Sequence, residues 1–201
     1  MSKQFYISAI GTDSGKSLAS AILCRHLNAA YYKPIQSGPD HDSTQIHKWL
    51  NGNVEILPEA YKLTQPMSPH IAAEKDGLEI TEKDLSLPKY DGNLVVESAG
   101  GLMVPINTKG LIMADLAKMW KLPVILVINH YLGAINHSLL SLEYCNTHDI
   151  EVAGIIFNGT DNLGNEGIIL WHYPLPIILR IPQLEQIDET AIDNLAKEVK
   201  L

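Results

Sequence analysis

Cysteine is scarce in this sequence. Only Cys24 and Cys145 occur among its 201 residues, and they lie far apart. Neither stands at the spacing of a zinc-ligand pair or within a dense cysteine pattern, so neither a zinc site nor a disulfide framework is indicated. We therefore expect two buried thiols in a reducing compartment.

Basic residues are also in the minority. The chain has 15 Lys and Arg residues against 23 Asp and Glu residues, and its formal net charge is -8. A protein that binds duplex nucleic acid usually carries a basic face that displaces counterions from the phosphates. The composition argues against a nucleic-acid partner, while a local basic site for a small phosphate stays compatible with it.

Long apolar runs are missing as well. The longest, such as residues 124–128, have the length of a strand and cannot cross a bilayer. The first eleven residues become polar too soon for the apolar region of a signal peptide. We expect a soluble, cytoplasmic protein without a membrane partner.

Short runs rich in Ile and Val predict the fold. Apolar residues make up 46% of the sequence, and we expect a single domain over residues 1–201. The runs are uninterrupted, which is typical of strands buried on both faces of a parallel sheet. They alternate with segments of helical periodicity, which predicts an α/β doubly wound sandwich with a mostly parallel central sheet and helices on both faces. The strands are expected at 5–10, 93–98, 123–129 and 152–158, and the helices at 16–27, 43–50, 113–120 and 136–147.

The rest of the chain is less regular. A short strand is expected at 174–179 and a last helix at 188–200. The segments 38–58 and 61–89 are expected to decorate the carboxyl edge of the sheet, where ligands bind in this architecture. The histidines are dispersed, and we interpret them mostly as surface or capping residues.

Residues 7–17, ISAIGTDSGKS, join an apolar strand to a helix through a turn with two glycines. The turn is one residue shorter than a standard phosphate loop, because Ile10 stands where that pattern has a glycine. N–H groups at a helix N-terminus still attract phosphate oxygens, Lys16 would reach the β- and γ-phosphates, and the Ser17 hydroxyl would bind Mg²⁺. The alternative is an incidental Gly-Lys-Ser turn, and the strand-to-helix placement favours the phosphate loop.

Two charged residues at strand ends could complete such a site. Glu97 follows three apolar strand residues and precedes a glycine-rich segment, so its carboxylate should emerge beside the loop as a ligand for Mg²⁺. Lys33 ends a second expected strand and is followed by Pro34, which favours a fixed cation in the cleft. Each could instead be an ordinary surface charge.

Together these motifs resemble the dethiobiotin synthetase family, over nearly the whole chain. The resemblance rests on five blocks in the family order, at 11–17, 33–38, 68–70, 96–105 and 132–137. It implies a P-loop NTPase-like fold and an ATP-dependent ring-closing ligase. Such an enzyme converts 7,8-diaminononanoate and CO₂ to dethiobiotin, through a carbamate and a carbamic-phosphoric anhydride, in biotin biosynthesis. ATP would be the co-substrate, Mg²⁺ the cofactor, and the enzyme a homodimer with its substrate site at the subunit interface.

The resemblance also implies roles for individual residues. Catalysis would fall to Lys33, Lys16 and Thr12, and Mg²⁺ would be held by Ser17, Asp42 and Glu97, with Asp40 as the alternative to Asp42. The nucleotide would be bound by Asp13, Ser14, Gly15, Lys16, Ser17 and Asn158, the last reading the adenine edge. The substrate would be bound by Ser37, Gly133, Ala134, Ile135 and Asn136, although Asn136 could also be a plain helix cap. The sequence departs from the family pattern in its shortened loop and in the serines at 17 and 98.

Three rival functions share the fold. A cobyrinate-type amide ligase usually carries a further glutaminase domain, for which this chain has no room. A partition-type ATPase switch carries an extra lysine at the start of the phosphate loop, where residues 8–10 have none. A nucleotide-binding module that has lost catalysis is disfavoured by the presence of Lys16, Lys33 and Glu97.

Overall fold

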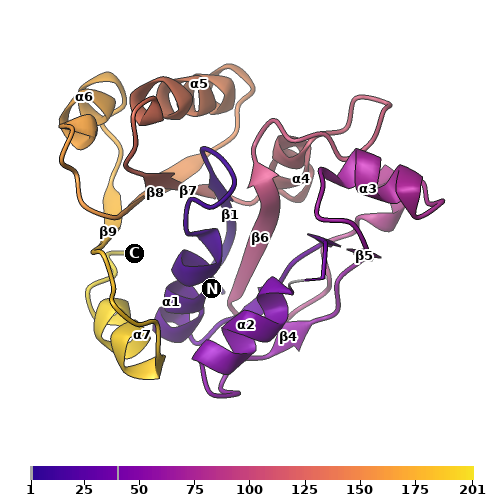
Figure 1. The fold of residues 1–201 in the computed structure, drawn as a ribbon, viewed down its shortest axis with the longest axis horizontal. Coiled ribbons are helices and arrows are strands. Elements are labelled where there is room, and N and C mark those ends of the chain that lie inside the picture. Colours follow the sequence, from indigo (N-terminus) through magenta and orange to yellow (C-terminus); the bar gives the residue numbers. More distant parts are fainter. Residues whose placement is uncertain (1, 40) are drawn as a thin grey trace.

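A single parallel sheet organises the computed structural model, which describes every residue except Met1 and Asp40. Seven strands follow the order β4-β2-β6-β1-β7-β8-β9, and each pairing between them is parallel (Figure 1). The expected α/β doubly wound sheet is therefore confirmed. The strands are β1 (Gln4–Ala9), β2 (Ala30–Tyr32), β4 (Ile56–Leu57), β6 (Leu94–Gly101), β7 (Val124–Asn129), β8 (Val152–Asn158) and β9 (Ile177–Ile181).

Helices cover both faces of the sheet, and each face has its own apolar core. One core joins the sheet to α1 (Lys16–Leu27), α2 (Asp42–Trp49) and α7 (Glu189–Ala196). The other core joins it to α4 (Met113–Trp120), α5 (Ala134–Thr147) and α6 (Asn165–His172). Neighbouring strand residues alternate between these cores: Val95 of β6 packs in the first and Val96 in the second, as a strand period of two requires. Figure 1 shows α5 and α6 on the opposite side of the sheet from α1 and α7.

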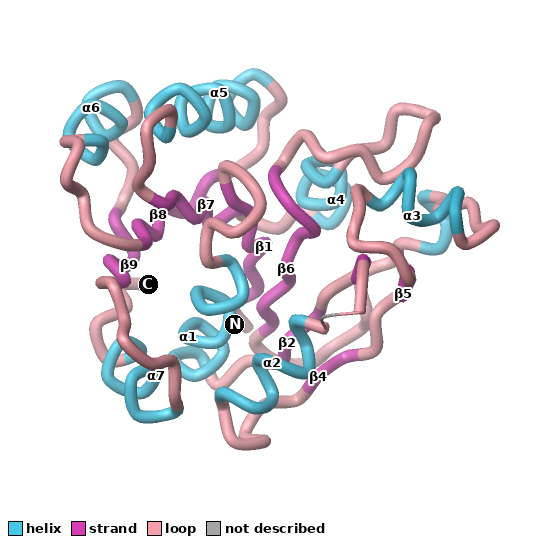
Figure 2. The backbone as a smooth tube through the Cα atoms, in the orientation of Figure 1, coloured by secondary structure: helices cyan, strands magenta, loops and turns pink. Residues whose placement is uncertain are grey.

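A small second sheet lies beside β6. In it β3 (Ile35–Ser37) pairs in parallel with β5 (Tyr61–Leu63), and α3 (Pro69–Lys75) packs against both strands. A short 3-10 turn, η1 (Glu82–Asp84), follows along the chain. Figure 2 shows long loops between these short elements, in the region that the sequence analysis assigned to the edge of the sheet.

Four expectations from the sequence need correction. The segment 38–58 is not only a decoration, because its residues Ile56 and Leu57 form the edge strand β4. β6 continues through the glycine-rich segment to Gly101, where a register shift against β1 accommodates the irregular backbone. The last helix ends at Ala196 instead of residue 200, and α6 was not expected at all. Its residues 168–171 form a continuous apolar run, which masks the helical period.

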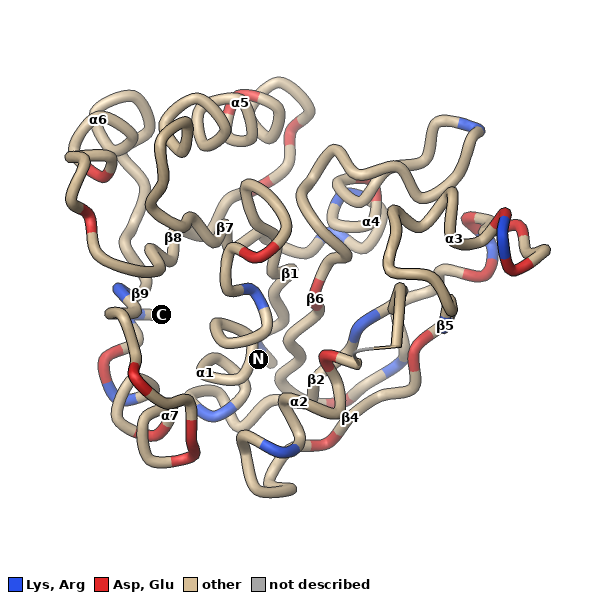
Figure 3. The backbone as a smooth tube through the Cα atoms, in the orientation of Figure 1, with Lys and Arg blue, Asp and Glu red and all other residues tan. Residues whose placement is uncertain are grey.

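Three further features concern the charged residues, the cysteines and the helices. Figure 3 shows Lys and Arg residues spread mostly singly along the tube, with acidic residues between them. Both cysteines are buried, as expected. No described helix combines the length and the apolar character that crossing a bilayer demands.

Candidate active site

The turn between β1 and α1 is built as an anion-binding loop. Gly15 precedes the helix with a φ of 92°, and Asp13 also adopts a left-handed φ of 56°. No side chain caps the start of α1, so its first N–H groups are left for a ligand. A Cβ at Gly15 would lie 2.3 Å from Nδ2 of Asn158, so the close approach of β8 to the loop requires glycine here.

Two polar side chains of this loop converge on one carbonyl. The Ser14 hydroxyl and the Lys16 ammonium each donate to the Gly11 carbonyl oxygen, both at 3.2 Å. Burial lowers the pKa of Lys16, against the opposing attraction of Glu97, because burial penalises the charged form. The Asn158 amide donates to the Ser14 carbonyl oxygen at 3.1 Å and ties β8 to the loop.

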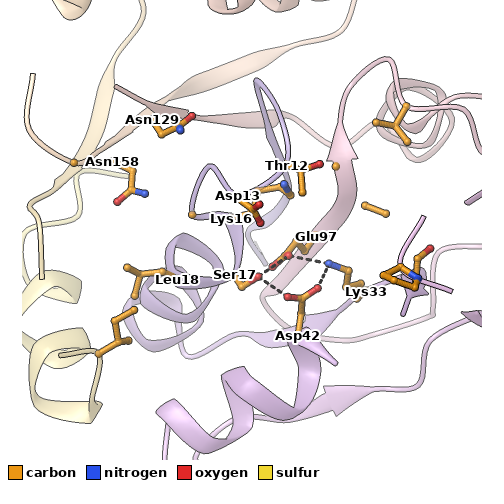
Figure 4. A pocket seen from close by; sticks show the side chains of 18 of the residues that line it. Thr12, Asp13, Lys16, Ser17, Leu18, Lys33, Asp42, Glu97, Asn129 and Asn158 are labelled. Atoms are coloured by element: carbon orange, nitrogen blue, oxygen red, sulfur yellow. Dashed lines mark hydrogen bonds and ion pairs between the residues drawn. The ribbon is translucent and has the colours of Figure 1, made fainter. Parts of the chain in front are cut away.

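Four side chains form a hydrogen-bonded cluster below the loop (Figure 4), here named the acid–lysine cluster: Ser17, Lys33, Asp42 and Glu97. The Ser17 hydroxyl lies 2.8 Å from Oδ1 of Asp42 and 3.1 Å from Oε1 of Glu97. The Lys33 ammonium donates to Oε1 of Glu97 at 3.0 Å and also pairs with Oδ2 of Asp42. Each residue comes from a different element or its end, namely α1, the chain after β2, α2 and β6.

The charges in the acid–lysine cluster stabilise one another. Burial by itself lowers the pKa of Lys33, but the Glu97 and Asp42 carboxylates outweigh it, so the pKa is raised and the group stays an ammonium. Burial raises the pKa of Asp42, and the Lys33 ammonium more than reverses that effect, so the net direction is downward. Glu97 is only 1% exposed, which makes an oppositely charged partner necessary.

Tyr31 is a further member of this neighbourhood that the sequence analysis did not select. Its hydroxyl donates to Oε2 of Glu97 at 3.1 Å, and its side chain is fully buried. The sequence offered only a partial signal, since Tyr31 lies in the expected strand two residues before Lys33. Nothing in the sequence alone indicated that Glu97, on the neighbouring strand, lies on the same face of the sheet as Tyr31.

A cleft of about 1190 Å³ lies at the carboxyl ends of the strands, beside the phosphate loop and the acid–lysine cluster. It gathers most of the residues predicted to form the site: Thr12, Asp13, Gly15, Lys16, Ser17, Lys33, Ser37, Asp42, Glu97 and Asn158. Its walls also include Pro182, Gln183 and Leu184 at the Asn158 end, and Met67, Ser68 and Pro69 at the other end. The Ser37 hydroxyl is buried there and has no partner among the described residues.

The structure places the remaining predicted residues elsewhere. Ser14 lines a smaller hollow of about 400 Å³ on the other side of the loop, next to Tyr131 and His137. The segment Gly133, Ala134, Ile135 and Asn136 starts α5 as expected, and it lines neither cavity. Asn136 is not the helix cap, because Gly133 occupies that position with a φ of 107°. Asp40, the alternative to Asp42, lies outside the described residues.

One histidine departs from the surface role expected for most of them. The His130 side chain is 3% exposed, and its ring stacks on Phe157 with centroids 5.6 Å apart. Its two ring nitrogens each lie 3.7 Å from a carboxylate oxygen, of Asp161 and of Glu166. The ring is buried against Phe157, and the sequence pattern around His130 gave no indication of this contact.

The donor atoms of the acid–lysine cluster fit a magnesium ion. The Ser17 hydroxyl lies within 3.1 Å of a carboxylate oxygen of both Asp42 and Glu97. Mg²⁺ prefers oxygen ligands and is usually held by one or two carboxylates together with water and substrate phosphates. This set therefore suits a metal that arrives with a phosphate-bearing ligand.

The fold and the phosphate loop define the class as P-loop NTPase-like. MinD of Pyrococcus horikoshii, solved with Mg-ADP, superposes with a TM-score of 0.58 at 15% identity, over 98% of this chain and 96% of that chain. A ParA family ATPase from Chlorobium tepidum gives a TM-score of 0.54 at 15% identity, over 98% and 99% of the two chains. At such identities these likenesses show the fold alone.

Sequence comparison shows the family. A family model described as an AAA domain matches residues 3–191. The ATP-dependent dethiobiotin synthetase of Cytophaga hutchinsonii is 44% identical, over 96% of this chain and 95% of its own. That of Christiangramia forsetii is 40% identical, over 100% and 97%. The chain belongs to the dethiobiotin synthetase family.

Removing the buried ammonium should destabilise the protein. Lys33→Met leaves the Asp42 and Glu97 carboxylates without their cation, and we expect a loss of about 3–5 kcal/mol in the free energy of unfolding. The measurement is urea unfolding in the presence of EDTA. The control is Lys109→Met, because the side chains of Lys109 and its partner Glu79 are 72% and 59% exposed, so the loss should stay below about 1 kcal/mol. Equal losses of unfolding free energy in the two variants would contradict the stabilising role of Lys33 in the acid–lysine cluster.

Gly15 can be tested against a matched glycine. Gly77 also has a positive φ, of 68°, but a Cβ there would meet nothing within 4 Å. Gly77→Ala should therefore cost only the backbone strain, about 1–2 kcal/mol. Gly15→Ala adds a clash with Asn158, so it should lower the free energy of unfolding further and weaken ADP binding, measured by calorimetry. If Gly15→Ala binds ADP as tightly as Gly77→Ala does, the requirement for glycine at position 15 of the loop is wrong.

Proposed function

We propose that this protein catalyses ATP-dependent closure of the dethiobiotin ring from 7,8-diaminononanoate and CO₂, releasing ADP and phosphate. The observation that carries the proposal is a single cleft in which the phosphate loop adjoins the acid–lysine cluster. Membership of the dethiobiotin synthetase family supports the same activity. The structural likeness to MinD and ParA extends to the fold alone and gives no support to a partition-type switch.

The nucleotide would lie along the cleft with its triphosphate at the start of α1. The N–H groups of residues 13–17 and the Lys16 ammonium would hold the phosphate oxygens. Lys16 can reach them by leaving the Gly11 carbonyl oxygen, which it now contacts at 3.2 Å. Asn158, at the opposite end of the cleft from Lys33 (Figure 4), would read the adenine edge, since an amide offers a donor and an acceptor together.

The reacting groups would meet between the loop and Lys33. A carbamate oxygen of the substrate attacks the γ-phosphorus, and the bond from phosphorus to ADP breaks. The second amine then attacks the carbamate carbon, and phosphate leaves with the former carbamate oxygen as the urea ring closes. Neither step needs a covalent enzyme intermediate, so the protein acts by positioning and charge stabilisation.

Several side chains are placed for that positioning. Lys33 would stabilise negative charge on the transferred phosphoryl group, and Thr12 and Ser37 line the same part of the cleft. The Ser37 hydroxyl is buried without a partner among the described residues, and it would bind the substrate after turning toward the cleft. Ser17, Asp42 and Glu97 would hold Mg²⁺, which supplies positive charge to the phosphates when it is bound.

Turnover provides the direct test. Purified protein with ATP, Mg²⁺, bicarbonate and 7,8-diaminononanoate should form dethiobiotin, detected by mass spectrometry. Lys16→Ala should lower kcat by about 10²–10³, the usual effect of removing one preorganised charge-stabilising group. Lys109→Met, on an exposed ion pair with Glu79 outside the cleft, is the control and should retain the wild-type rate. The proposal is wrong if the wild-type protein forms no dethiobiotin while it hydrolyses ATP.

The start of α5 would bind the substrate carboxylate across a dimer interface. Gly133 and Asn136 are exposed and line neither cavity of this subunit, which suits a site completed by a second copy. The Ala134 N–H donates to the Tyr131 carbonyl oxygen, and the following N–H groups of Ile135 and Asn136 would attract a carboxylate, as at a helix N-terminus without a side-chain cap. In the proposed homodimer each site therefore combines the phosphate loop of one subunit with the α5 start of the other.

Mixed dimers test this arrangement. Asn136→Asp adds a negative charge that repels the substrate carboxylate but favours the helix, so the fold is kept. Neither Asn136→Asp nor Lys16→Ala alone should be active at low substrate concentration. After subunit exchange, a mixed dimer regains one intact site, so the mixture should recover about a quarter of wild-type activity if exchange is random. No recovery, with mixed dimers verified by native mass spectrometry, would refute the shared site.

A further inference from the structure

Two fully buried tyrosines differ in what their hydroxyls contact. Tyr6 of β1 donates to the Met113 carbonyl oxygen at 2.9 Å, inside the core on the α4 face. Tyr31 of β2 donates to Oε2 of Glu97 at 3.1 Å, inside the core on the α1 face. The first contact joins a strand to a helix, whereas the second acts on a charged side chain of the acid–lysine cluster.

The sheet register explains how Tyr31 reaches Glu97. β2 and β6 are parallel, and Tyr31 lies opposite Val95, two residues before Glu97. Because strand side chains alternate, Val95 and Glu97 share the face that Tyr31 occupies. The phenol ring is long enough to reach its diagonal neighbour along that face. The register therefore places its hydroxyl against the carboxylate.

The three donors divide between the two oxygens of Glu97. Oε1 accepts from Ser17 at 3.1 Å and from Lys33 at 3.0 Å, and both lie on the cleft side. Oε2 accepts from Tyr31, which is buried in the core. A buried carboxylate with donors on both oxygens cannot rotate without losing one of these bonds.

We propose that Tyr31 is a positioning residue that fixes the Glu97 carboxylate so that Oε1 faces Ser17 and the magnesium site. The proposal rests on the metal role of Glu97 within the proposed function. Groups that hydrogen-bond a metal ligand from behind set its orientation, and their loss commonly weakens metal binding by about 10–100-fold. Tyr31 acts through Glu97 and touches neither nucleotide nor substrate.

Tyr31→Phe against Tyr6→Phe is the matched test. Both variants lose one buried hydroxyl: Tyr6→Phe gives up the contacts to the carbonyl oxygen and sulfur of Met113, and only Tyr31→Phe loses a bond to the acid–lysine cluster. Mg²⁺ affinity is measured by calorimetric titration with ADP present, together with the Mg²⁺ concentration for half-maximal dethiobiotin formation. We expect Tyr31→Phe to raise the Mg²⁺ dissociation constant and the half-maximal Mg²⁺ concentration each by about tenfold, and Tyr6→Phe to leave both within about twofold of wild type. Equal effects of the two substitutions would overturn the proposal.

The Glu97→Gln variant shows whether Tyr31 influences Mg²⁺ binding through Glu97. The Glu97→Gln variant has no charged carboxylate oxygen for Tyr31 to orient. Adding Tyr31→Phe to it should therefore change Mg²⁺ affinity by less than about twofold. The double variant has no unpaired buried charge. It can therefore be measured even if Tyr31→Phe alone does not fold. A further tenfold loss in the double variant would overturn the proposal.

Failure of the inference and failure of the proposed function give different results. If the wild-type protein forms no dethiobiotin, the proposed function fails whatever Tyr31 does. If the wild type is active and Tyr31→Phe matches Tyr6→Phe, only the positioning role fails. If Glu97→Gln binds Mg²⁺ as tightly as wild type, Glu97 is not a ligand and the inference falls with that assignment.

Discussion

A buried ammonium between two carboxylates is the constraint on which the site depends. Lys33 is 5% exposed, and it can remain charged there only because Glu97 and Asp42 face it. Each partner comes from a separate segment, so satisfying this one charge fixes the chain after β2, the start of α2 and the middle of β6 together. Ser17 hydrogen-bonds both carboxylates and adds α1 to the same arrangement, which couples the cluster to the phosphate loop.

The parallel sheet makes this arrangement available. Its strands all point the same way, so their carboxyl ends and the following loops meet along one edge, where the cleft lies. Lys33 within the cluster and Lys16 of the neighbouring phosphate loop both interact with the Asp42 and Glu97 carboxylates, so these two lysines together balance the two acidic charges. A triphosphate brings strong negative charge to this point, and a metal ion that it carries offsets part of that charge.

Much of the fold could be predicted from the sequence because its central elements carry strong periodic signals. α1 and α4 begin and end at the expected residues, and uninterrupted apolar runs indicated β1, β6, β7 and β8. β4 has two residues and α6 is continuously apolar over part of its length, so neither offers a period to detect. Glu97 and Lys33 were found from their expected positions at strand ends; Lys33 does follow β2 directly, but β6 continues past Glu97 to Gly101. Tyr31 depends on the register between β2 and β6, which one sequence does not contain. The single domain over residues 1–201, the cytoplasmic location and the individual site roles stay predictions.

The central claim is that the acid–lysine cluster and the phosphate loop form one reaction centre. A crystal structure with a non-hydrolysable ATP analogue, Mg²⁺ and 7,8-diaminononanoate tests it most directly. The account predicts the γ-phosphate between the Lys16 and Lys33 ammonium groups, with the metal bound by Ser17 and by Asp42 or Glu97, directly or through water. A triphosphate bound away from residues 11–17, or a metal without contact to the cluster, would contradict it.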